Sequence, residues 1–285
     1  MRVKALREIV GDYGRRRPGD VFDVADHSAR ILIHRNLVQP WPHIEAPRQP
    51  ARETQAFFCA PEVKAASGPL VSCIIPTADR PKFLACAIRS FLGQEYNPKE
   101  LLVLDDGREE SSGVMPPASE IPQGVRIRYF RLNERMTVGQ KRNLGVRLAE
   151  GYLIAHFDDD DVSAPDRLDT QVGQILGANA NVVGYRDVVF ADGKQRFFRM
   201  TGDPGYAAGT SLLYRRDWAL ENPFPEIQQG EDNAFISKAG PSLVTVPSGD
   251  RIIARIHSGN TVKKRPGGKG WTRLTKQEIP AWANI

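Results

Sequence analysis

The 285-residue sequence has few cysteines and lacks a long apolar run. Its cysteines, Cys59, Cys73 and Cys86, are odd in number and have no CxxC spacing, which excludes a disulfide framework and a four-cysteine zinc site. No stretch approaches the roughly 20 apolar residues that span a bilayer, so we expect no transmembrane segment. The N-terminus has no continuous apolar core before small residues, and we therefore expect a cytoplasmic protein.

One further absence and the distribution of charge narrow the range of possible functions. No glycine-rich phosphate loop of the Walker or dinucleotide type follows any expected strand, which argues against kinases and dehydrogenases. The net charge of +5 arises at the ends, with nine Lys and Arg against six Asp and Glu over residues 1–48 and six against one over residues 262–285. The basic C-terminal segment fits either a phosphate-rich surface or, as we prefer, a solvated and frayed terminus. We expect no specific nucleic-acid binding.

The chain divides by composition into four parts. Residues 1–45 predict a small α+β accessory unit, with strands at 2–6 and 21–24 forming a hairpin and a helix from Asp26 to about Asn36. Residues 46–69 contain several prolines without a clear period and predict a linker. Residues 70–262 predict the main domain, and residues 263–285 form a basic tail.

Within the main domain, short apolar runs alternate with helical patterns. The runs at 70–75, 101–104, 127–132 and 152–157 predict strands. Helices are predicted at 81–96 and 137–150, the second opened by a capping box of Thr137 and Gln140. Strands that are apolar throughout and separated by helices indicate an open, mainly parallel sheet sandwiched by helices. The predicted fold class is therefore α/β.

Three of the predicted strands end in polar clusters: Thr77-Ala78-Asp79-Arg80, Asp105-Asp106-Gly107 and Asp158–Asp161. The carboxyl ends of parallel strands share one edge, where ligands bind. Four adjacent aspartates raise one another's pKa, and a divalent cation with oxygen ligands, Mn²⁺ or Mg²⁺, would relieve their repulsion. The alternatives are a helix N-cap for the four aspartates and an ordinary turn for Asp105-Asp106-Gly107.

Basic residues fall in the first turns of the second predicted helix. Backbone N–H groups there, with Lys141 or Arg142, could hold a diphosphate, and a solvated helix face is the alternative interpretation.

Together, VSCIIPTADRPKFLACAIRSFLGQEY, LLVLDDG and GQKRNLGVRLAEGYLIAHFDDDD resemble, in order and spacing, the opening half of an inverting family 2 glycosyltransferase with the GT-A fold. The resemblance covers roughly residues 70–260. It implies a metal-dependent enzyme that moves a sugar from a nucleotide diphosphate sugar, with a UDP-sugar favoured, to a hydroxyl. The acceptor would be a carbohydrate, a lipid-linked molecule or a protein.

The resemblance also implies roles for individual residues. The nucleotide would contact Thr77, Asp79, Asp105 and Asp106. The family's Asp-x-Asp motif maps onto Asp158-Asp159-Asp160, with the first carboxylate toward the ribose and the last at the metal. The register within the four aspartates stays open, because Asp161 could substitute. Asp158 and Asp159 thus join Lys141 and Arg142 among the expected donor-binding residues, and Asp158 and Asp160 are the expected metal ligands.

The second half of the domain resembles the acceptor region of the same family. Gly209, Thr210 and Ser211 would bind the acceptor, and Asp232 would be the general base, supported by Glu231. Alternatively, the two acidic residues only favour a helix N-terminus. His257 follows an apolar strand on a polar loop, where it is either a third metal ligand or a structural histidine.

Two other functions remain as alternatives. A sugar-phosphate nucleotidyltransferase would also use a metal and carboxylates, but it would need a glycine-rich phosphate loop where this sequence has PTADRP. A non-catalytic sugar-nucleotide-binding or assembly protein would act through residues 1–45. Intact carboxylates at three separate positions argue against a protein that has lost its catalytic activity.

Overall fold

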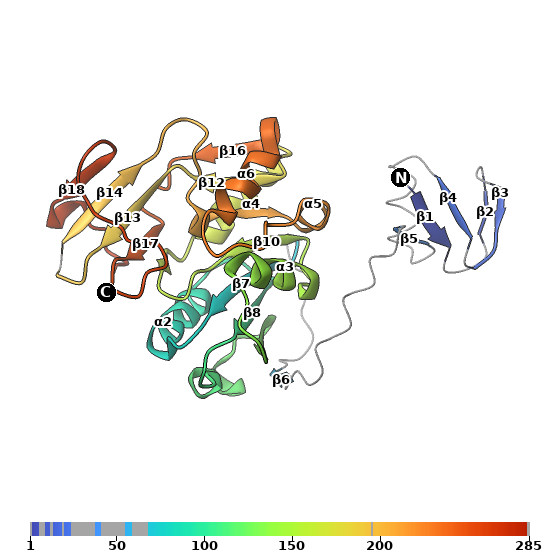
Figure 1. The fold of residues 1–285 in the computed structure, drawn as a ribbon, viewed down its shortest axis with the longest axis horizontal. Helices are drawn as coiled ribbons and strands as arrows, with labels where there is room; N and C mark the ends of the chain where they lie inside the picture. Colours follow the sequence, from blue (N-terminus) through green and yellow to red (C-terminus); the bar gives the residue numbers. More distant parts are fainter. Residues whose placement is uncertain are drawn as a thin grey trace. The chain divides into compact units, whose positions relative to one another are not determined.

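The structure is a computed structural model that describes residues 2–5, 9–11, 14–18, 20–23, 38–40, 55–58, 68–194 and 196–283. The chain divides into two compact units, residues 1–52 and 53–285, which are described separately (Figure 1).

The first unit contains a three-stranded antiparallel sheet. Its central strand β1 (Arg2–Ala5) lies between β4 (Val21–Asp23) and β5 (Val38–Pro40). The two predicted strands are thus confirmed, and they pair with each other. A separate hairpin joins β2 (Ile9–Gly11) to β3 (Gly14–Arg16). The helix predicted from Asp26 to Asn36 lies outside the described residues.

The second unit is built on an eight-stranded sheet with the order β16-β12-β15-β10-β7-β8-β9-β6. Its strands are β6 (Gln55–Phe58), β7 (Val71–Thr77), β8 (Lys99–Asp105), β9 (Val125–Arg131), β10 (Leu153–His156), β12 (Val182–Tyr185), β15 (Leu213–Arg215) and β16 (Leu243–Val246). The strands β10, β7, β8 and β9 run parallel and confirm the four predicted ones. From the predicted linker, β6 pairs antiparallel with β9 at the edge of this sheet.

Helices cover both faces of the large sheet (Figure 1). The helices α2 (Pro81–Leu92) and α4 (Arg167–Gly177) pack on the face that carries Cys73 and Ile75. The opposite face, which carries Ile74, packs against α3 (Val138–Leu148), α5 (Arg216–Glu221) and α6 (Glu231–Ala239). This alternation along β7 gives each face its own core, as a fully buried strand requires. The predicted α/β fold class, with a mainly parallel sheet sandwiched by helices, is confirmed.

The two predicted helices are confirmed, but they end earlier than predicted, at Leu92 and Leu148. The capping box opens α3 as expected: Gln140 N donates to Thr137 Oγ1 at 3.2 Å, and Thr137 N donates to Gln140 Oε1 at 2.9 Å. The side chain of Lys141, in the first turns of α3, reaches the ends of β7 and β8. Within the described ranges, no helix is both long enough and apolar enough to cross a bilayer.

A second sheet of five strands has the order β11-β17-β13-β14-β18. Its strands are β11 (Val162–Ser163), β13 (Asp187–Ala191), β14 (Phe197–Thr201), β17 (Ile252–Arg255) and β18 (Trp271–Leu274). Since β11 follows the four aspartates directly and pairs with β17, this sheet brings residues 158–161 close to the loop after Arg255. The strand β18 pairs with β14, so the expectation of a frayed terminus is wrong for residues 271–274.

Short 3-10 helices connect several of these elements. They are η1 (Ser112–Val114), η2 (Ala118–Glu120), η3 (Gly209–Ser211), η4 (Gly240–Ser242) and η5 (Lys276–Glu278).

Candidate active site

The polar clusters that follow β7, β8 and β10 are directly connected to one another. Thr77 Oγ1, at the end of β7, donates a hydrogen bond of 2.7 Å to Asp159 Oδ2, after β10. Lys141 Nζ, from α3, lies 2.8 Å from Asp106 Oδ1 and 3.1 Å from the carbonyl oxygen of Thr77. The three clusters therefore meet at one edge of the sheet, where ligands bind in open parallel sheets.

Asp105 is completely buried and shapes the turn that follows β8. Its Oδ1 accepts a bond from Gly107 N at 2.8 Å, and its Oδ2 accepts bonds from Ser111 N at 2.9 Å and from the Tyr129 hydroxyl at 2.7 Å. Such a carboxylate holds a loop in place. A Cβ at Gly107 would lie 2.8 Å from Asp79 N, so only glycine lets the two loops approach this closely.

These two loops enclose a cavity of about 280 Å³. It is lined by Asp79, Pro81, Arg108, Glu109, Glu110 and Ser111. Asp79 adopts a left-handed backbone conformation with φ of 56° and accepts a bond from Arg108 N at 2.5 Å. This bond and the ion pair with Arg135 hold the pKa of Asp79 below its usual range.

Lys141 and Arg142, in the first turns of α3, are buried, so the solvated helix face considered from the sequence is wrong. Lys141 pairs with Asp106, whose other oxygen accepts a bond from Met136 N at 2.8 Å. Arg142 lies 2.7 Å from Glu231 Oε1 and 3.4 Å from Asp158 Oδ1. Both cations are thus compensated by carboxylates, and Arg142 links the aspartates after β10 to the first residue of α6.

The four aspartates after β10 have four different environments. Asp158 faces Arg142, Asp159 faces Thr77, and Asp161 Oδ1 accepts a bond from Arg255 N at 3.3 Å. Since α4 begins only at Arg167, the helix N-cap considered for these aspartates is wrong.

Burial resists ionisation at three of the four aspartates. It raises the pKa of Asp158, although Arg142 opposes the shift. Burial, with the neighbouring charge of Asp160, raises the pKa of Asp159 to about 6 and that of Asp161 well above its usual value. A cation near these carboxylates would favour their charged forms.

Asp160 and His257 are in direct contact. Oδ2 of Asp160 lies 2.9 Å from His257 Nε2 and 3.2 Å from Asn260 Nδ2. The imidazole stacks on Phe83 at 4.4 Å, and its Nδ1 accepts a bond from Gly259 N at 3.1 Å. Because Nδ1 accepts, a neutral imidazole carries its proton on Nε2 and donates it to Asp160. His257 is therefore arranged here as a donor that orients Asp160.

The residues fit a divalent cation in part. Among the described residues, no group of three or more His, Cys, Asp or Glu side chains is placed to bind a metal ion. Two nearby carboxylates, Asp158 and Asp160, nevertheless match the donor chemistry of Mg²⁺ or Mn²⁺, which usually takes one or two carboxylates and completes its shell with phosphate and water. His257 would have to give up its bond from Gly259 to become a ligand through Nε2.

Sequence reasoning missed Arg80. Its guanidinium lies 3.0 Å from Asp159 Oδ1 and 3.2 Å from Asp160 Oδ2, and it also donates to the carbonyl of Gly259. The side chain is 25% exposed, so it lies at the surface of the carboxylate cluster. The sequence signal is its position directly after Asp79, in the polar cluster that ends the first strand.

Sequence reasoning also missed Arg167, which is fully buried at the start of α4. Its guanidinium donates to the carbonyls of His156 at 2.8 Å and Thr210 at 3.0 Å, and to Ser163 Oγ at 2.9 Å. A buried charge needs such hydrogen bonds. Arg167 thereby fixes the turn after β10 against η3.

The expected acceptor residues and the expected base lie together. A Cβ at Gly209 would come within 2.1 Å of Asp232 Oδ2, so the absence of a side chain there admits the carboxylate. Thr210 is held through its carbonyl by Arg167, and Ser211 is buried and bonded to Tyr185 N at 2.7 Å. Asp232 is half-buried in the first turn of α6, and Glu231 beside it forms an ion pair with Arg142.

Comparisons with known proteins agree with this architecture. The family model for glycosyl transferase family 2 matches residues 72–229. Glycosyltransferase GlyG of Streptococcus pneumoniae is 28% identical over 131 residues, which cover 45% of this chain and 43% of that protein. The succinoglycan biosynthesis protein ExoO of Rhizobium meliloti is 32% identical over 127 residues, covering 44% of this chain and 36% of that protein. The chain thus spans less than half the length of these relatives.

Solved structures share the fold. Staphylococcus aureus TarS 1-349, in complex with UDP-GlcNAc, superposes with a TM-score of 0.56 at 18% identity, covering 67% of this chain and 60% of that one. The mannosyltransferase PcManGT from Pyrobaculum calidifontis, in complex with GDP-Man and Mn²⁺, has a TM-score of 0.55 at 16% identity, covering 71% and 62%. The fold is of the GT-A type. With the family model matched over more than half of its residues, the chain belongs to glycosyl transferase family 2.

Proposed function

We propose that this protein is an inverting, metal-dependent glycosyltransferase that moves a sugar from a nucleotide diphosphate sugar to a hydroxyl group. The observation that carries the proposal is the connected network at the sheet edge. It joins Thr77 and Asp159 to Arg80 on one side, and Asp158 through Arg142 to Glu231 on the other. Family membership and the nucleotide-sugar complexes of its structural neighbours support the same chemistry.

The nucleotide would bind between the loops after β7 and β8. The cavity there is lined by Ser111, whose turn is held by Asp105, and by Asp79. In this arrangement Thr77 and Asp159 support the floor of the donor site, and Asp105 acts by shaping the loop. We propose a uridine nucleotide as the donor, as the family resemblance implies.

The metal would be held by Asp158 and Asp160. When bound, Mn²⁺ or Mg²⁺ would offset the negative charge of the leaving diphosphate. The chain's own hydrogen-bond donors act on the carboxylates: Arg142 orients Asp158, Lys141 orients Asp106, and His257 orients Asp160. Of the cations described here, Arg80 lies at the surface of the cluster, and it is the one we assign to the diphosphate.

Asp232 would act as the general base. Its Oδ2 lies over Gly209, so an acceptor hydroxyl held by η3 would reach the carboxylate. The carboxylate takes the hydroxyl proton while the acceptor oxygen forms a bond to the anomeric carbon and the bond from that carbon to the diphosphate breaks. This single displacement inverts the anomeric centre.

A panel of nucleotide sugars tests the proposal. We expect a UDP-sugar with Mn²⁺ to raise the melting temperature, because a ligand at 100 times its dissociation constant stabilises the folded state by about 2.7 kcal/mol. Thermal unfolding is measured with UDP-, GDP- and TDP-sugars, each with and without Mn²⁺. If no nucleotide diphosphate or its sugar shifts the transition, the proposed donor class is wrong.

The N-terminal unit should be separable from this site. Deleting residues 1–45 removes the sheet around β1 but keeps β6, which pairs with β9 at the edge of the large sheet. We expect the truncated protein to bind UDP and hydrolyse the donor as the full chain does, and calorimetry with a hydrolysis assay measures both. A folded truncation that does not bind UDP would instead assign part of the donor site to this unit.

A further inference from the structure

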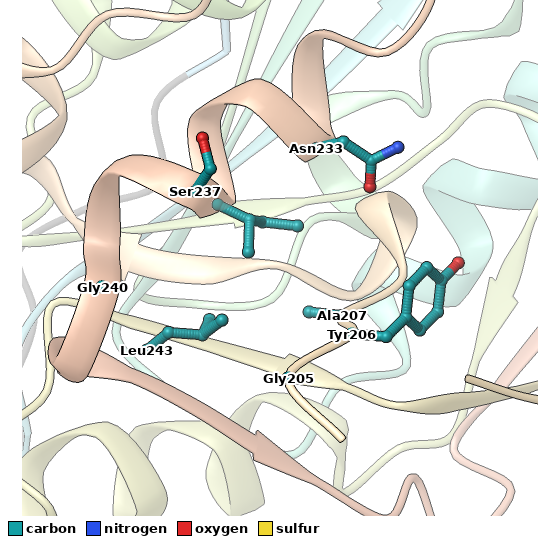
Figure 2. A pocket seen from close by; sticks show the side chains of 8 residues that line it. Gly205, Tyr206, Ala207, Asn233, Ser237, Gly240 and Leu243 are labelled. Atoms are coloured by element: carbon teal, nitrogen blue, oxygen red, sulfur yellow. The ribbon is translucent and has the colours of Figure 1, made fainter. Parts of the chain in front are cut away.

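A second cavity lies on the α6 side of the site and has no role in the proposed donor chemistry. Its volume is about 340 Å³. It lies between α6, the start of β16 and the segment 205–207 (Figure 2). The lining consists of Gly205, Tyr206, Ala207, Asn233, Ile236, Ser237, Gly240 and Leu243.

The lining combines an apolar floor with polar groups at the rim. Ala207 and Ile236 are buried, and Leu243 is partly buried beside them. The side-chain amide of Asn233 is exposed and makes no hydrogen bond with any described residue, so it is available to a ligand. Ser237 is also exposed, and its hydroxyl reaches only the carbonyl of Ala234, one turn back on α6. None of the lining side chains is charged.

Two glycines lie at the open border of the cavity. A Cβ at Gly205 or Gly240 would meet nothing within 4 Å, so both positions border open space. At Gly202, by contrast, a Cβ would come within 2.2 Å of the Tyr206 ring, so the ring packs directly on the backbone. Tyr206 is therefore a fixed wall of the cavity.

The cavity is adjacent to the proposed base. Asn233 follows Asp232 directly in the first turn of α6, and Gly209, which the Asp232 carboxylate approaches, lies two residues after Ala207 of the lining. Tyr206 lies close enough that the charge of Asp232, in addition to burial, raises the pKa of its hydroxyl. A molecule in the cavity would thus extend toward the carboxylate over Gly209.

We propose that this cavity is an acceptor subsite for a neutral saccharide ring, an inference that rests on the proposed function. A pyranose has an apolar C–H face, which matches Ala207, Ile236 and the Tyr206 ring, and hydroxyls that can bond to Asn233. An anionic group would meet the negative charge of the nearby Asp232 with no cation in the lining, which is unfavourable. A purely apolar chain would leave the exposed amide of Asn233 and the Ser237 hydroxyl unused.

Saturation-transfer NMR of the full chain tests this subsite. The neutral probes are the methyl glycosides of glucose, galactose and mannose, and the charged probes are the anions glucuronic acid and galacturonic acid. We expect at least one neutral probe to receive saturation and the charged ones to receive none. Ser237→Trp, which fills the cavity from an exposed position, should weaken the neutral probe about tenfold, equivalent to about 1.4 kcal/mol.

Two further variants keep the test decisive. Ser237→Ala leaves the space open and should retain the neutral probe. Asn233→Ala should weaken it even if Ser237→Trp does not fold.

UDP binding, measured by calorimetry on the same samples, reports the donor site separately. If UDP binds but no neutral probe does, the subsite is wrong while the proposed function stands. Equal binding of charged probes, or binding that survives both Ser237→Trp and Asn233→Ala, would overturn it as well. If the neutral probe binds but none of UDP, GDP and TDP does, the proposed function fails while the saccharide site remains.

Discussion

Asp232→Asn should reduce sugar transfer by about 10²–10⁴-fold, the usual loss when a positioned base is removed. The amide has the shape of the carboxylate and still fits over Gly209, but it cannot accept the acceptor's proton. UDP binding should be unchanged, because Asp158 and Asp160 belong to the other side of the site. Initial rates of transfer and calorimetric titration with UDP measure the two effects separately.

Glu231→Gln is the matched control. Glu231 is buried and lies 2.7 Å from Arg142. The substitution removes its negative charge, so Asp158 is then the only carboxylate that pairs with Arg142. We expect lower stability and a milder loss of transfer than for Asp232→Asn. If Glu231→Gln abolishes transfer while Asp232→Asn remains active, the roles of the two residues must be exchanged. If both variants transfer normally, neither residue is the base.

The parallel core of the sheet could be predicted because its signals are local. Runs such as 101–104 are apolar throughout, and Thr137 and Gln140 mark the start of a helix by their spacing alone. The strands β6 and β18 could not be predicted in the same way, because they are short edge strands formed by pairing with β9 and β14. Their stability comes from the partner strand, which a local pattern does not reveal.

The location of the candidate site could also be predicted, but its pairings could not. Strand ends are visible in the sequence, and the topology of a parallel sheet brings them together. Which groups then meet depends on residues far apart in the chain: Thr77 and Asp159 are 82 positions apart, and Arg142 and Glu231 are 89 apart. Arg80 and Arg167 were missed for the same reason, since their partners are carboxylates and carbonyls on other elements.

The second large effect that we expect is the loss of metal-dependent UDP binding. We expect Asp160→Asn to weaken UDP binding in Mn²⁺ by at least about 10–100-fold, because the loss of a residue that merely supports a metal ligand already lowers metal affinity by that factor. It should also remove the difference between titrations in Mn²⁺ and in EDTA. The asparagine oxygen can still accept the bond from His257, and Arg80 keeps Asp159, so the loop should retain its shape. Calorimetry with UDP in Mn²⁺ and in EDTA measures both expectations.

Asp161→Asn decides the register of the metal ligand. Its Oδ1 accepts a bond from Arg255 N, which an asparagine oxygen can also accept, so the fold of β11 should be preserved. We expect this variant to bind UDP as the wild type does, with the same dependence on Mn²⁺. If Asp161→Asn loses the metal dependence and Asp160→Asn keeps it, the ligand lies one residue further along the chain. If the unmodified protein binds UDP equally well in Mn²⁺ and in EDTA, the carboxylates serve only their protein partners, because a bound cation would have to change the affinity for the diphosphate.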